Sequence, residues 1–577
     1  MINAITEFNE NITIQINNNN GNETTPTTPT PTQTQMYFGK LTIRTPPVEI
    51  TDKTQYILFT IDRSSSMKEN GKDGQTKLYH VKNVFKNMLE FLAKQTHETA
   101  IYIGVQTFDT DVEIIIPRVR ISPDNVDELV ASIWKIEPRG FTNIQKALVQ
   151  ANKLLRDATT ATAIQPQMTH IFMTDGSPTI GCMNFQELNA LVASGIYNDA
   201  GDEIEVIHQF IGIGLDHNSH LLHLLGENKN GEYYFIDNAE NAGVLYGELL
   251  HRILYISLFD VVIKTMSEIC GGGGGILLYD WKTNEWVNEI TEKSFVGDAV
   301  KTYHVASQRA DVDFVNEMIL CVHAWNRYDE LEIEYVPFTL TLAPDTTPTT
   351  TPLATHTPTP TPLECYVYRQ KVLEMLYKSK QQHNTNTAKQ QHNNDNNANI
   401  NPYNFIKRRA VRDAPRNYEK EIEEKEKKQE HKKELKLFYR EMKQFMKEKG
   451  FLENVFMLNL CNDIEICYNT FDTTYGHMFS ATRQSTQANE MTYNVSDENV
   501  PLRDDADDGA YDNDNDDTDN INNNDRNWDD DDDCYDDYNN NINDDIKTQN
   551  NKYMTPYKNK NILATINQIT TQSPMTL

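Results

Sequence analysis

The chain has 577 residues and a formal net charge of −31, and its apolar residues gather between residues 36 and 345. This acidic balance argues against nucleic acid as a direct partner, because a phosphate backbone attracts positive charge. No stretch approaches about 18 consecutive apolar residues and no basic segment precedes an apolar one near the N-terminus, so we expect no membrane contact, no transmembrane segment, no signal peptide and an intracellular location, cytoplasmic or nuclear.

Composition and hydrophobic patterning divide the chain into successive segments of different kinds. The two terminal segments and the linker are too polar to form a core of their own. The predicted segments are, in chain order, a disordered Asn/Thr/Pro-rich segment (1–35), a β-strand that pairs with the later β-domain (36–51), an α/β domain (52–257), a β-sandwich-like domain (258–345), a Thr/Pro linker (346–362), a helical and mixed region (363–496) with a Gln/Asn-rich loop (381–402), and an acidic, Asn-rich disordered tail (497–577).

Buried strands alternate with amphipathic helices through the segment 52–257. The predicted strands include 56–62, 100–108, 168–175 and 203–214, and the predicted helices include 77–95, 142–158 and 185–199. This alternation predicts an α/β fold with a doubly wound, mostly parallel, Rossmann-like sheet. Because ligands bind such sheets outside the carboxyl ends of the strands, a candidate site is expected at that edge.

Small oxygen-bearing side chains follow two of these strands. Asp62 ends the first strand, with Ser64 and Ser66 at the next alternate positions, and Asp175 ends another strand. The loop before the helix 142–158 offers Thr142. An all-oxygen set with few charges suits Mg²⁺ or Mn²⁺, which are hard cations. Because hydroxyl groups leave such an ion under-neutralised, it would attract a Glu or Asp carboxylate from a protein partner as its last ligand.

The segments "FTIDRSSSM", "GFTN" and "MTDGSPT" resemble the von Willebrand factor type A family, in which a metal-ion-dependent adhesion site has the pattern D-x-S-x-S, then Thr, then Asp-Gly. The resemblance implies that Ser64, Ser66 and Thr142 coordinate the metal directly. It also implies that Asp62 and Asp175 act directly or through water. A single D-x-S-x-S also occurs in helix caps and turns, so the prediction depends on all five positions occurring on one fold.

Other motifs have simpler explanations than a chemical site. His217, His220 and His223 are spaced so that they drift around a helix whose leucines form its buried face, which disfavours a zinc site. The glycine run 271–275 lacks the Lys-Ser/Thr ending of a phosphate loop and predicts a hairpin loop. Arg63 occupies a variable position of the adhesion motif, where it could crowd or pair with an acidic ligand.

The remainder of the chain predicts a β-domain followed by helices. Short alternating strands between 258 and 345 predict a small antiparallel sandwich. The charged helix 418–450 carries an apolar stripe in its later part, suited to docking or to pairing with another helix as in a coiled coil, and docking on the β-domain is the preferred interpretation. The segment 475–487 looks like part of the C-terminal region of ubiquitin-ligase-like and inter-α-inhibitor-like proteins with a type A domain, but the cysteine spacing excludes a RING domain.

Most of the negative charge lies in the predicted tail. Residues 497–545 contain 21 acidic residues and two arginines, a net charge of −19. Such a run is typical of a solvated acidic polymer, which favours solubility or a basic partner. The seven cysteines include no C-x-x-C pair, so neither a zinc module nor a disulfide framework is expected.

Together these features predict a non-enzymatic, metal-dependent binding or scaffold protein. One alternative is a metal-assisted hydrolase, which would need a general base near the metal. His170 precedes the strand end at Asp175 and is expected to point elsewhere. A structural or virion component and an adaptor for a separate ATPase are further alternatives.

Overall fold

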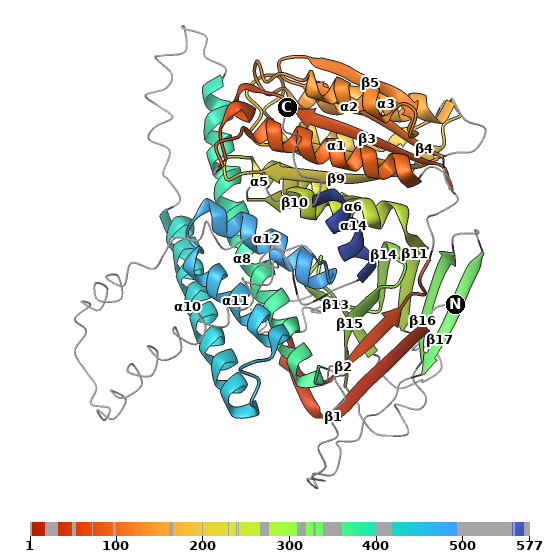
Figure 1. The fold of residues 1–577 in the computed structure, drawn as a ribbon. Coiled ribbons are helices and arrows are strands. Elements are labelled where there is room, and N and C mark those ends of the chain that lie inside the picture. Colours follow the sequence, from red (N-terminus) through yellow and green to blue (C-terminus); the bar gives the residue numbers. More distant parts are fainter. Residues whose placement is uncertain are drawn as a thin grey trace.

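The structure is a computed structural model that combines an α/β domain, a β-domain and a helical region, with the α/β domain at the top of Figure 1. The residues it describes are 3–17, 33–48, 53–71, 73–95, 100–160, 166–198, 200–228, 230–237, 239, 242–265, 276–308, 319–326, 330–337, 361–398, 418–492, 555, 557 and 560–570. Three predicted features lie outside them: the linker at 346–360, the glycine run 271–275 and the acidic stretch 497–545.

The α/β domain is built on a six-stranded sheet in the order β10-β9-β6-β3-β4-β5. Its strands are β3 (Gln55–Asp62), β4 (Ile101–Phe108), β5 (Val112–Arg120), β6 (Gln167–Thr174), β9 (Val206–Ile213) and β10 (Gly231–Ile236). Neighbouring strands pair in parallel except β5, which pairs antiparallel with β4 at one edge. The predicted mostly parallel α/β sheet is therefore confirmed.

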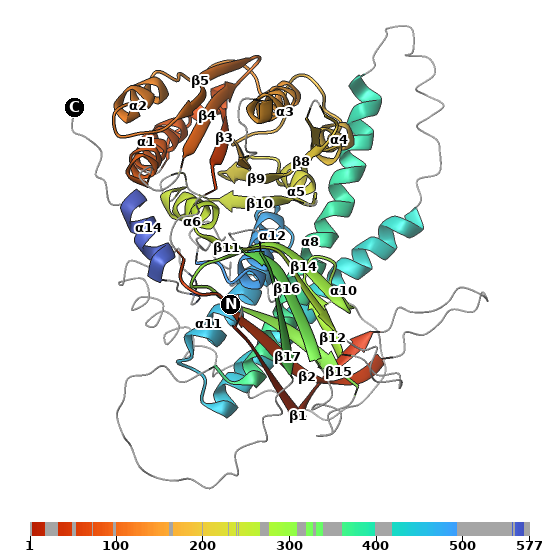
Figure 2. The same ribbon diagram turned by 90° about the vertical axis from the view of Figure 1, so that its right-hand side faces the viewer.

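Helices cover both faces of this sheet, with α1 and α6 on one side and α3 and α4 on the other (Figure 2). The helices are α1 (Lys77–Gln95), α2 (Val126–Trp134), α3 (Ile144–Thr160), α4 (Phe185–Ala193), α5 (Ser219–Gly226) and α6 (Ala242–Leu254). Successive side chains of a strand point to opposite faces. Phe59 therefore packs on Phe85 of α1, with ring centroids 4.8 Å apart, whereas Leu58 shares a cluster with Leu155 of α3.

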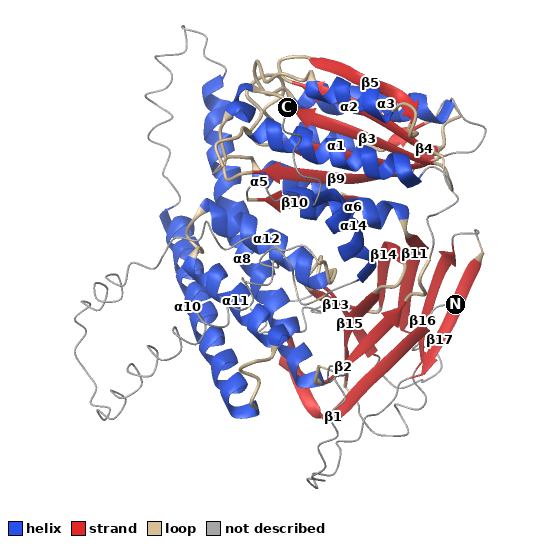
Figure 3. Ribbon diagram, viewed as in Figure 1, coloured by secondary structure: helices blue, strands red, loops and turns tan. Residues whose placement is uncertain are grey.

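The β-domain consists of two antiparallel sheets, whose strands are red in Figure 3. One sheet has the order β1-β2-β15-β12-β13 and the other β14-β11-β16-β17. Their strands are β1 (Asn3–Asn17), β2 (Gln33–Arg44), β11 (Ile256–Thr265), β12 (Ile276–Asp280), β13 (Glu285–Val287), β14 (Glu289–Val296), β15 (Val300–Ser307), β16 (Ile319–Asn326) and β17 (Leu331–Pro337). Leu41 and Val305 from the first sheet share one core with Val261 and Val322 from the second.

The N-terminal segment contributes to this domain through two strands. β2 pairs with β15, so residues before and after the α/β domain meet in one sheet. The prediction that residues 1–35 are disordered is wrong for β1, which pairs with β2. Phe8, Ile14 and Ile16 of β1 are buried, each followed or preceded by polar residues. The average polarity of the segment conceals this alternation, which is enough for an edge strand on an existing sheet.

The helical region contains α8 (Leu363–Ala398), α10 (Tyr418–Lys449), α11 (Val455–Asn469) and α12 (Thr474–Ala488). The predicted Gln/Asn-rich loop 381–402 is corrected, because residues as far as Ala398 continue α8. The apolar stripe of α10 packs against α8 and α11 rather than against the β-domain. Within the described residues, no helix is both long and apolar enough to cross a membrane.

A buried arginine joins the helical region to the β-domain. Arg369 of α8 is 1% exposed and donates hydrogen bonds to the carbonyl oxygens of Thr302 on β15, at 3.1 Å, and Gln487 on α12, at 2.6 Å. Guanidinium groups offer several donors in a fixed geometry, which suits the bridging of separate elements. α8 is therefore one element through which the helical region contacts the β-domain, and Gln484 of α12 adds a hydrogen bond to the carbonyl oxygen of Trp281 at 2.9 Å.

A C-terminal helix, α14 (Lys560–Thr570), corrects the prediction that residues 497–577 are wholly disordered. It packs against α6 and α1 of the α/β domain, burying Ile562, Ile566 and Ile569. Asn87 of α1 also donates a hydrogen bond to the carbonyl oxygen of Ile569 at 2.6 Å. The three isoleucines have the i, i+4, i+7 spacing of a helix face, a local pattern that the preceding acidic stretch masks in any average.

The contact between α14 and α6 depends on a glycine and gives a stability prediction. A Cβ at Gly247 would lie 2.7 Å from the Cα of Ile566, so a side chain there would push α14 away. We expect Gly247→Leu to lower the free energy of unfolding by about 2 kcal/mol, measured by urea denaturation of the full chain. As a control, the nearest atom to a Cβ at Gly243 is the side-chain methyl of Thr570 at 3.0 Å, which can move, whereas the Cα of Thr570 is 3.9 Å away, so Gly243→Ala should be close to neutral. Equal stability of Gly247→Leu and wild type would contradict the docking of α14.

Candidate metal centre

The predicted oxygen donors lie at the carboxyl end of the parallel strands. β3 and β6 are parallel neighbours, so their ends meet at one edge of the sheet. Asp62 is the last residue of β3, and Asp175 directly follows β6. Ser64 and Ser66 lie in the turn and short 3₁₀ helix η1 (Ser65–Lys68), and Thr142 lies just before α3.

Hydrogen bonds connect four of the five residues to their neighbours at the site. Asp62 is fully buried, and its Oδ1 accepts the backbone N–H of Ser64 at 2.7 Å. The hydroxyl oxygens of Ser64 and Ser66 share a hydrogen bond of 3.0 Å. Ser66 in turn donates to Oδ1 of Asp175 at 2.6 Å. The turn after β3 therefore aims both serine hydroxyls along the sheet edge toward the end of β6.

Thr142 approaches the same point from the loop before α3. A Cβ added to Gly176 would lie 3.8 Å from the hydroxyl oxygen of Thr142 and 3.8 Å from that of Ser66, so the two hydroxyls flank one space. The backbone of Thr142 is fixed by Thr179, whose hydroxyl accepts its N–H at 2.8 Å and whose own N–H donates to its carbonyl at 2.9 Å. The glycine after Asp175 thus leaves room between hydroxyl groups from two loops.

The two carboxylates of the site are buried close to one another. Burial raises the pKa of Asp62 to about 7, and the negative charge of Asp175 adds to this effect. Burial also raises the pKa of Asp175, although Ser66 and Lys77 partly oppose it. A divalent cation between these groups would favour both charged forms, since opposite charge lowers the pKa of a carboxyl group. The oxygen donors and their buried charge therefore fit Mg²⁺ or a similar hard cation.

Lys77 is a member of the site that the sequence patterns did not indicate. It is the first residue of α1, and its ammonium lies 3.1 Å from Oδ2 of Asp175 and 2.5 Å from Oε2 of Glu69. A lysine in the first turn of a helix is too common to mark a site. Its proximity to Asp175, 98 positions away, is set by the packing of α1 beside the sheet edge.

Arg63 was expected to crowd or pair with an acidic ligand, but its side chain pairs with Asp109 and Glu113 instead. Its side chain is 4% exposed, with Nε 2.8 Å from Oδ2 of Asp109 and Nη1 2.7 Å from Oε2 of Glu113. Oδ2 of Asp109 also accepts a hydrogen bond from Nε of Arg139 at 3.0 Å. The backbone of the motif is tied to the same loop, because the N–H of Arg139 donates to the carbonyl of Arg63 at 2.7 Å. Arg63 therefore fixes the turn after β3 through its contacts with Asp109 and Glu113.

His170 and His217 form hydrogen bonds with residues other than the five oxygen donors. His170 is buried within β6, with ring nitrogens 2.9 Å from the Thr60 hydroxyl and 3.2 Å from Nδ1 of His208. His217 bonds to the carbonyl of Gly214 and to the hydroxyl of Tyr233, each at 2.6 Å. Within the described residues no group of three or more His, Cys, Asp and Glu side chains could hold a metal ion. The candidate metal centre is thus the hydroxyl-rich one.

Residues 57–177 match the family model described as von Willebrand factor type A domain. This range contains most of β3, the whole of β6 and all five predicted donors. The chain therefore contains a von Willebrand factor type A domain, as its motifs indicated.

A curated relative and several solved structures are similar to parts of the chain. Inter-alpha-trypsin inhibitor heavy chain H2 of Homo sapiens is 26% identical over 179 residues, which are 30% of this chain and 17% of that protein. The match thus spans less than a fifth of the relative's length.

Three solved structures are similar to parts of the chain at low sequence identity. A von Willebrand factor type A protein from Catenulispora acidiphila has a TM-score of 0.40 and 12% identity, covering 60% of this chain and 76% of that one. The ArnB paralog VWA2 from Sulfolobus acidocaldarius has a TM-score of 0.41 and 10% identity, covering 85% and 98%. Proximal thread matrix protein 1 from the mussel byssus, with a zinc-occupied MIDAS motif, has a TM-score of 0.28 and 19% identity, covering 35% and 49%.

Proposed function

We propose that the chain is a non-enzymatic binding protein whose type A domain captures an acidic side chain of a protein partner through a bound Mg²⁺ or Mn²⁺. The residues that would hold the ion are Asp62, Ser64, Ser66, Thr142 and Asp175. The observation that carries the proposal is the convergence of these oxygen donors at one sheet edge, with both carboxylates buried.

The donor set explains why the partner would supply a carboxylate. A bound divalent ion supplies a hard, positively charged position that prefers oxygen ligands. Three of the five proposed donors are hydroxyl groups, so they stabilise the ion without cancelling its charge. Lys77 adds positive charge beside Asp175. The two carboxylates of the set balance the formal charge of the ion, and Lys77 is shared between Asp175 and Glu69. An incoming Glu or Asp side chain would therefore bind as the oxygen ligand that completes the coordination of the ion.

Exposed apolar side chains near the site suit contact with a protein partner. Phe141, adjacent to Thr142, is 61% exposed, and Leu215, two residues after the end of β9, is 41% exposed. Both lie on loops at the carboxyl end of the sheet, as the donors do. Apolar side chains around a polar anchor are typical of protein-binding surfaces. The partner would contact these side chains while its carboxylate reaches the metal.

The first test is a calorimetric Mg²⁺ titration of the full chain. We expect the double variant Asp62→Ala with Ser64→Ala to bind Mg²⁺ at least about tenfold more weakly than wild type, because it loses a carboxylate and a direct hydroxyl ligand. Ser65→Ala is the matched control, since Ser65 occupies the variable position and its exposed hydroxyl donates to the carbonyl of Gly140 at 3.0 Å. This control should bind like wild type.

The second test measures capture of an acidic ligand. Wild type should be retained on immobilised polyglutamate in Mg²⁺ and released by EDTA, and the double variant should not be retained. Wild type that binds Mg²⁺ neither alone nor with the acidic peptide would contradict the proposal. The intracellular location and a basic partner for the acidic stretch stay predictions from the sequence.

A further inference from the structure

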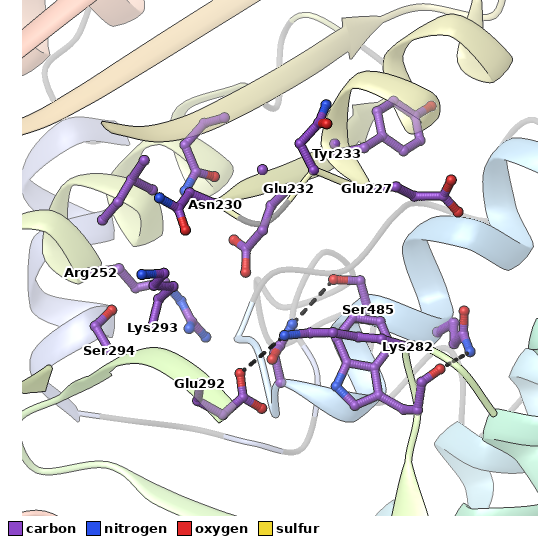
Figure 4. Close-up of a pocket in the computed structure, with 18 of the residues that line it drawn as sticks. Glu227, Asn230, Glu232, Tyr233, Arg252, Lys282, Glu292, Lys293, Ser294 and Ser485 are labelled. Atoms are coloured by element: carbon purple, nitrogen blue, oxygen red, sulfur yellow. Dashed lines mark hydrogen bonds and ion pairs between the residues drawn. The ribbon is translucent and has the colours of Figure 1, made fainter. Parts of the chain in front are cut away.

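A second candidate site lies where the α/β domain, the β-domain and the helical region meet. It is a cavity of about 440 Å³ at the amino-terminal ends of β9 and β10, the opposite end of these strands from the metal centre. Figure 4 shows Glu232 from β10, Arg252 from α6, Glu292 and Lys293 from β14 and Ser485 from α12 around it. This volume lies within the range of small-molecule pockets, which often form at domain interfaces.

The charges of this cavity are mixed, with an incompletely neutralised set of lysines. Lys282 and Lys301 share the single carboxylate of Glu292, at 3.4 and 2.9 Å. Lys380 of α8 is only 5% exposed, and the negative charge of Glu227, which lines the same cavity, acts on its ammonium group. Burial lowers the pKa of both Lys301 and Lys380. Burial thus outweighs the nearby carboxylates Glu292 and Glu227 at these two lysines, so their ammonium groups would gain from an anion in the cavity.

Two other cations at the wall already have partners outside the cavity. Arg252 pairs with Glu248 at 3.1 Å, and Lys293 pairs with Asp260 at 3.2 Å and also with Glu205. Arg252 and Lys293 therefore attract an anion less strongly than Lys282, Lys301 and Lys380 do. The anion-binding part of the site is the side formed by Lys282, Lys301 and Lys380.

The other polar residues of the cavity wall, among them Glu232, Gln209 and Gln484, suit the hydroxyl groups of a ligand. Glu232 and Lys282 both extend into the space from opposite walls (Figure 4). Gln209 and Gln484 are buried, and the Oε1 atom of each has no hydrogen-bond partner among the described residues. A hydroxyl group both donates and accepts, so it can satisfy a carboxylate or amide oxygen and an ammonium together. Trp281 adds an aromatic wall against which an apolar ring face could pack.

We propose that this interdomain cavity binds a phosphorylated polyhydroxy compound, of the class of sugar phosphates and inositol phosphates. The phosphate would lie against the three lysines, where charge-assisted hydrogen bonds are strongest. The hydroxyl groups would meet Glu232 and the buried amide oxygens. Because the walls come from all three parts of the chain, the ligand would also hold these parts together. The site is separate from the metal centre and does not depend on the proposed metal binding.

The experiment is a calorimetric and thermal-shift titration of the full chain with glucose 6-phosphate, fructose 6-phosphate and inositol 1,4,5-trisphosphate. The unphosphorylated parent compounds and inorganic phosphate are the matched probes. We expect at least one phosphorylated compound to bind at least about tenfold more tightly than both its parent and inorganic phosphate. Absence of binding by all three, or equal binding by a parent compound or by inorganic phosphate, overturns the proposal.

Two substitutions on one helix locate the binding. Lys380→Met should weaken binding of the active compound at least about tenfold while leaving the ligand-free melting temperature equal or higher, because the cost of burying this ammonium group outweighs its attraction to Glu227. Lys378→Met is the control on α8, since Lys378 is 46% exposed and pairs with Glu434 at 3.5 Å. If Lys380→Met does not fold, Lys282→Met at the cavity rim should show the same loss. Binding that is unchanged in the cavity variant, or equally reduced in Lys378→Met, overturns the assignment.

Discussion

Asp109→Ala should lower the free energy of unfolding by about 3 kcal/mol, because it removes the carboxylate that neutralises a buried arginine. Arg63 and Asp109 are both nearly inaccessible, and Nε of Arg63 lies 2.8 Å from Oδ2 of Asp109. Burial alone would raise the pKa of Asp109, but the N–H of Asp111 and the guanidinium groups of Arg139 and Arg63 hold it below its ordinary value. Loss of this carboxylate leaves Arg63 with Glu113, a residue that is 52% exposed.

The control for this prediction is Arg139→Ala, which removes an exposed partner of the same Asp109 carboxylate. Arg139 contacts Oδ2 of Asp109 at 3.0 Å, but its side chain is 63% exposed. Exposed ion pairs contribute little because water screens them, so Arg139→Ala should cost much less than Asp109→Ala. Urea denaturation at neutral pH measures both variants. If the two substitutions cost the same, burial of the Arg63–Asp109 pair is not what stabilises the turn that carries Ser64 and Ser66.

Glu292→Gln should cost about 3 kcal/mol at neutral pH and progressively less as the solution is acidified below about pH 4.5. Burial alone would raise the pKa of Glu292, but the ammonium groups of Lys301 and Lys282 hold it at about 2, against an ordinary value of 4.5. The hydroxyl of Tyr303 also donates to its Oε1 at 3.3 Å. Because the folded pKa is depressed, the unfolded chain binds the proton more readily. The stabilisation is therefore present above pH 4.5 and is lost as pH falls from 4.5 toward 2.

The measurement compares the unfolding free energies of wild type and Glu292→Gln from about pH 7 to about pH 3.5. The difference between them should shrink by roughly 1 kcal/mol across the acidic end of this range. Taking a difference removes the contribution of the other carboxylates. Glu289→Gln on the same strand is the control, since Glu289 is 49% exposed and its partner Lys264 lies 3.7 Å away. A Glu292→Gln difference that stays constant with pH would contradict the depressed pKa.

The fold of the α/β domain and the position of its candidate site were predictable because both depend on local patterns. Strands buried on both faces are continuous apolar runs, and helices between them show one apolar face. Asp62 and Asp175 mark the ends of two such strands, and parallel strands bring their carboxyl ends to one edge. The turn that presents Ser64 and Ser66 begins with a hydrogen bond between residues only two positions apart.

Several features were not predictable because their partners are remote in sequence. β1 and α14 lie in segments whose average composition is polar or acidic, and each packs on a surface formed by residues far away. The side chain of Arg63 turns away from the site because Asp109 and Glu113 lie behind the turn. No pattern around Lys77 indicates that its ammonium reaches Asp175.

The sequence by itself determined the type A domain, its strand order in the chain and the residues proposed as metal donors, because hydrophobic periodicity and strand-end polar residues are properties of short segments. Only the tertiary structure decided which charges accompany those donors and where the second cavity lies. The lysines and glutamates of that cavity come from β10, β14, β15, α8 and the turns after α5 and β12, which are brought together by packing between three parts of the chain. Such long-range packing sets both the neutralisation of buried charge and the shape of a pocket, and neither can be read from any one segment.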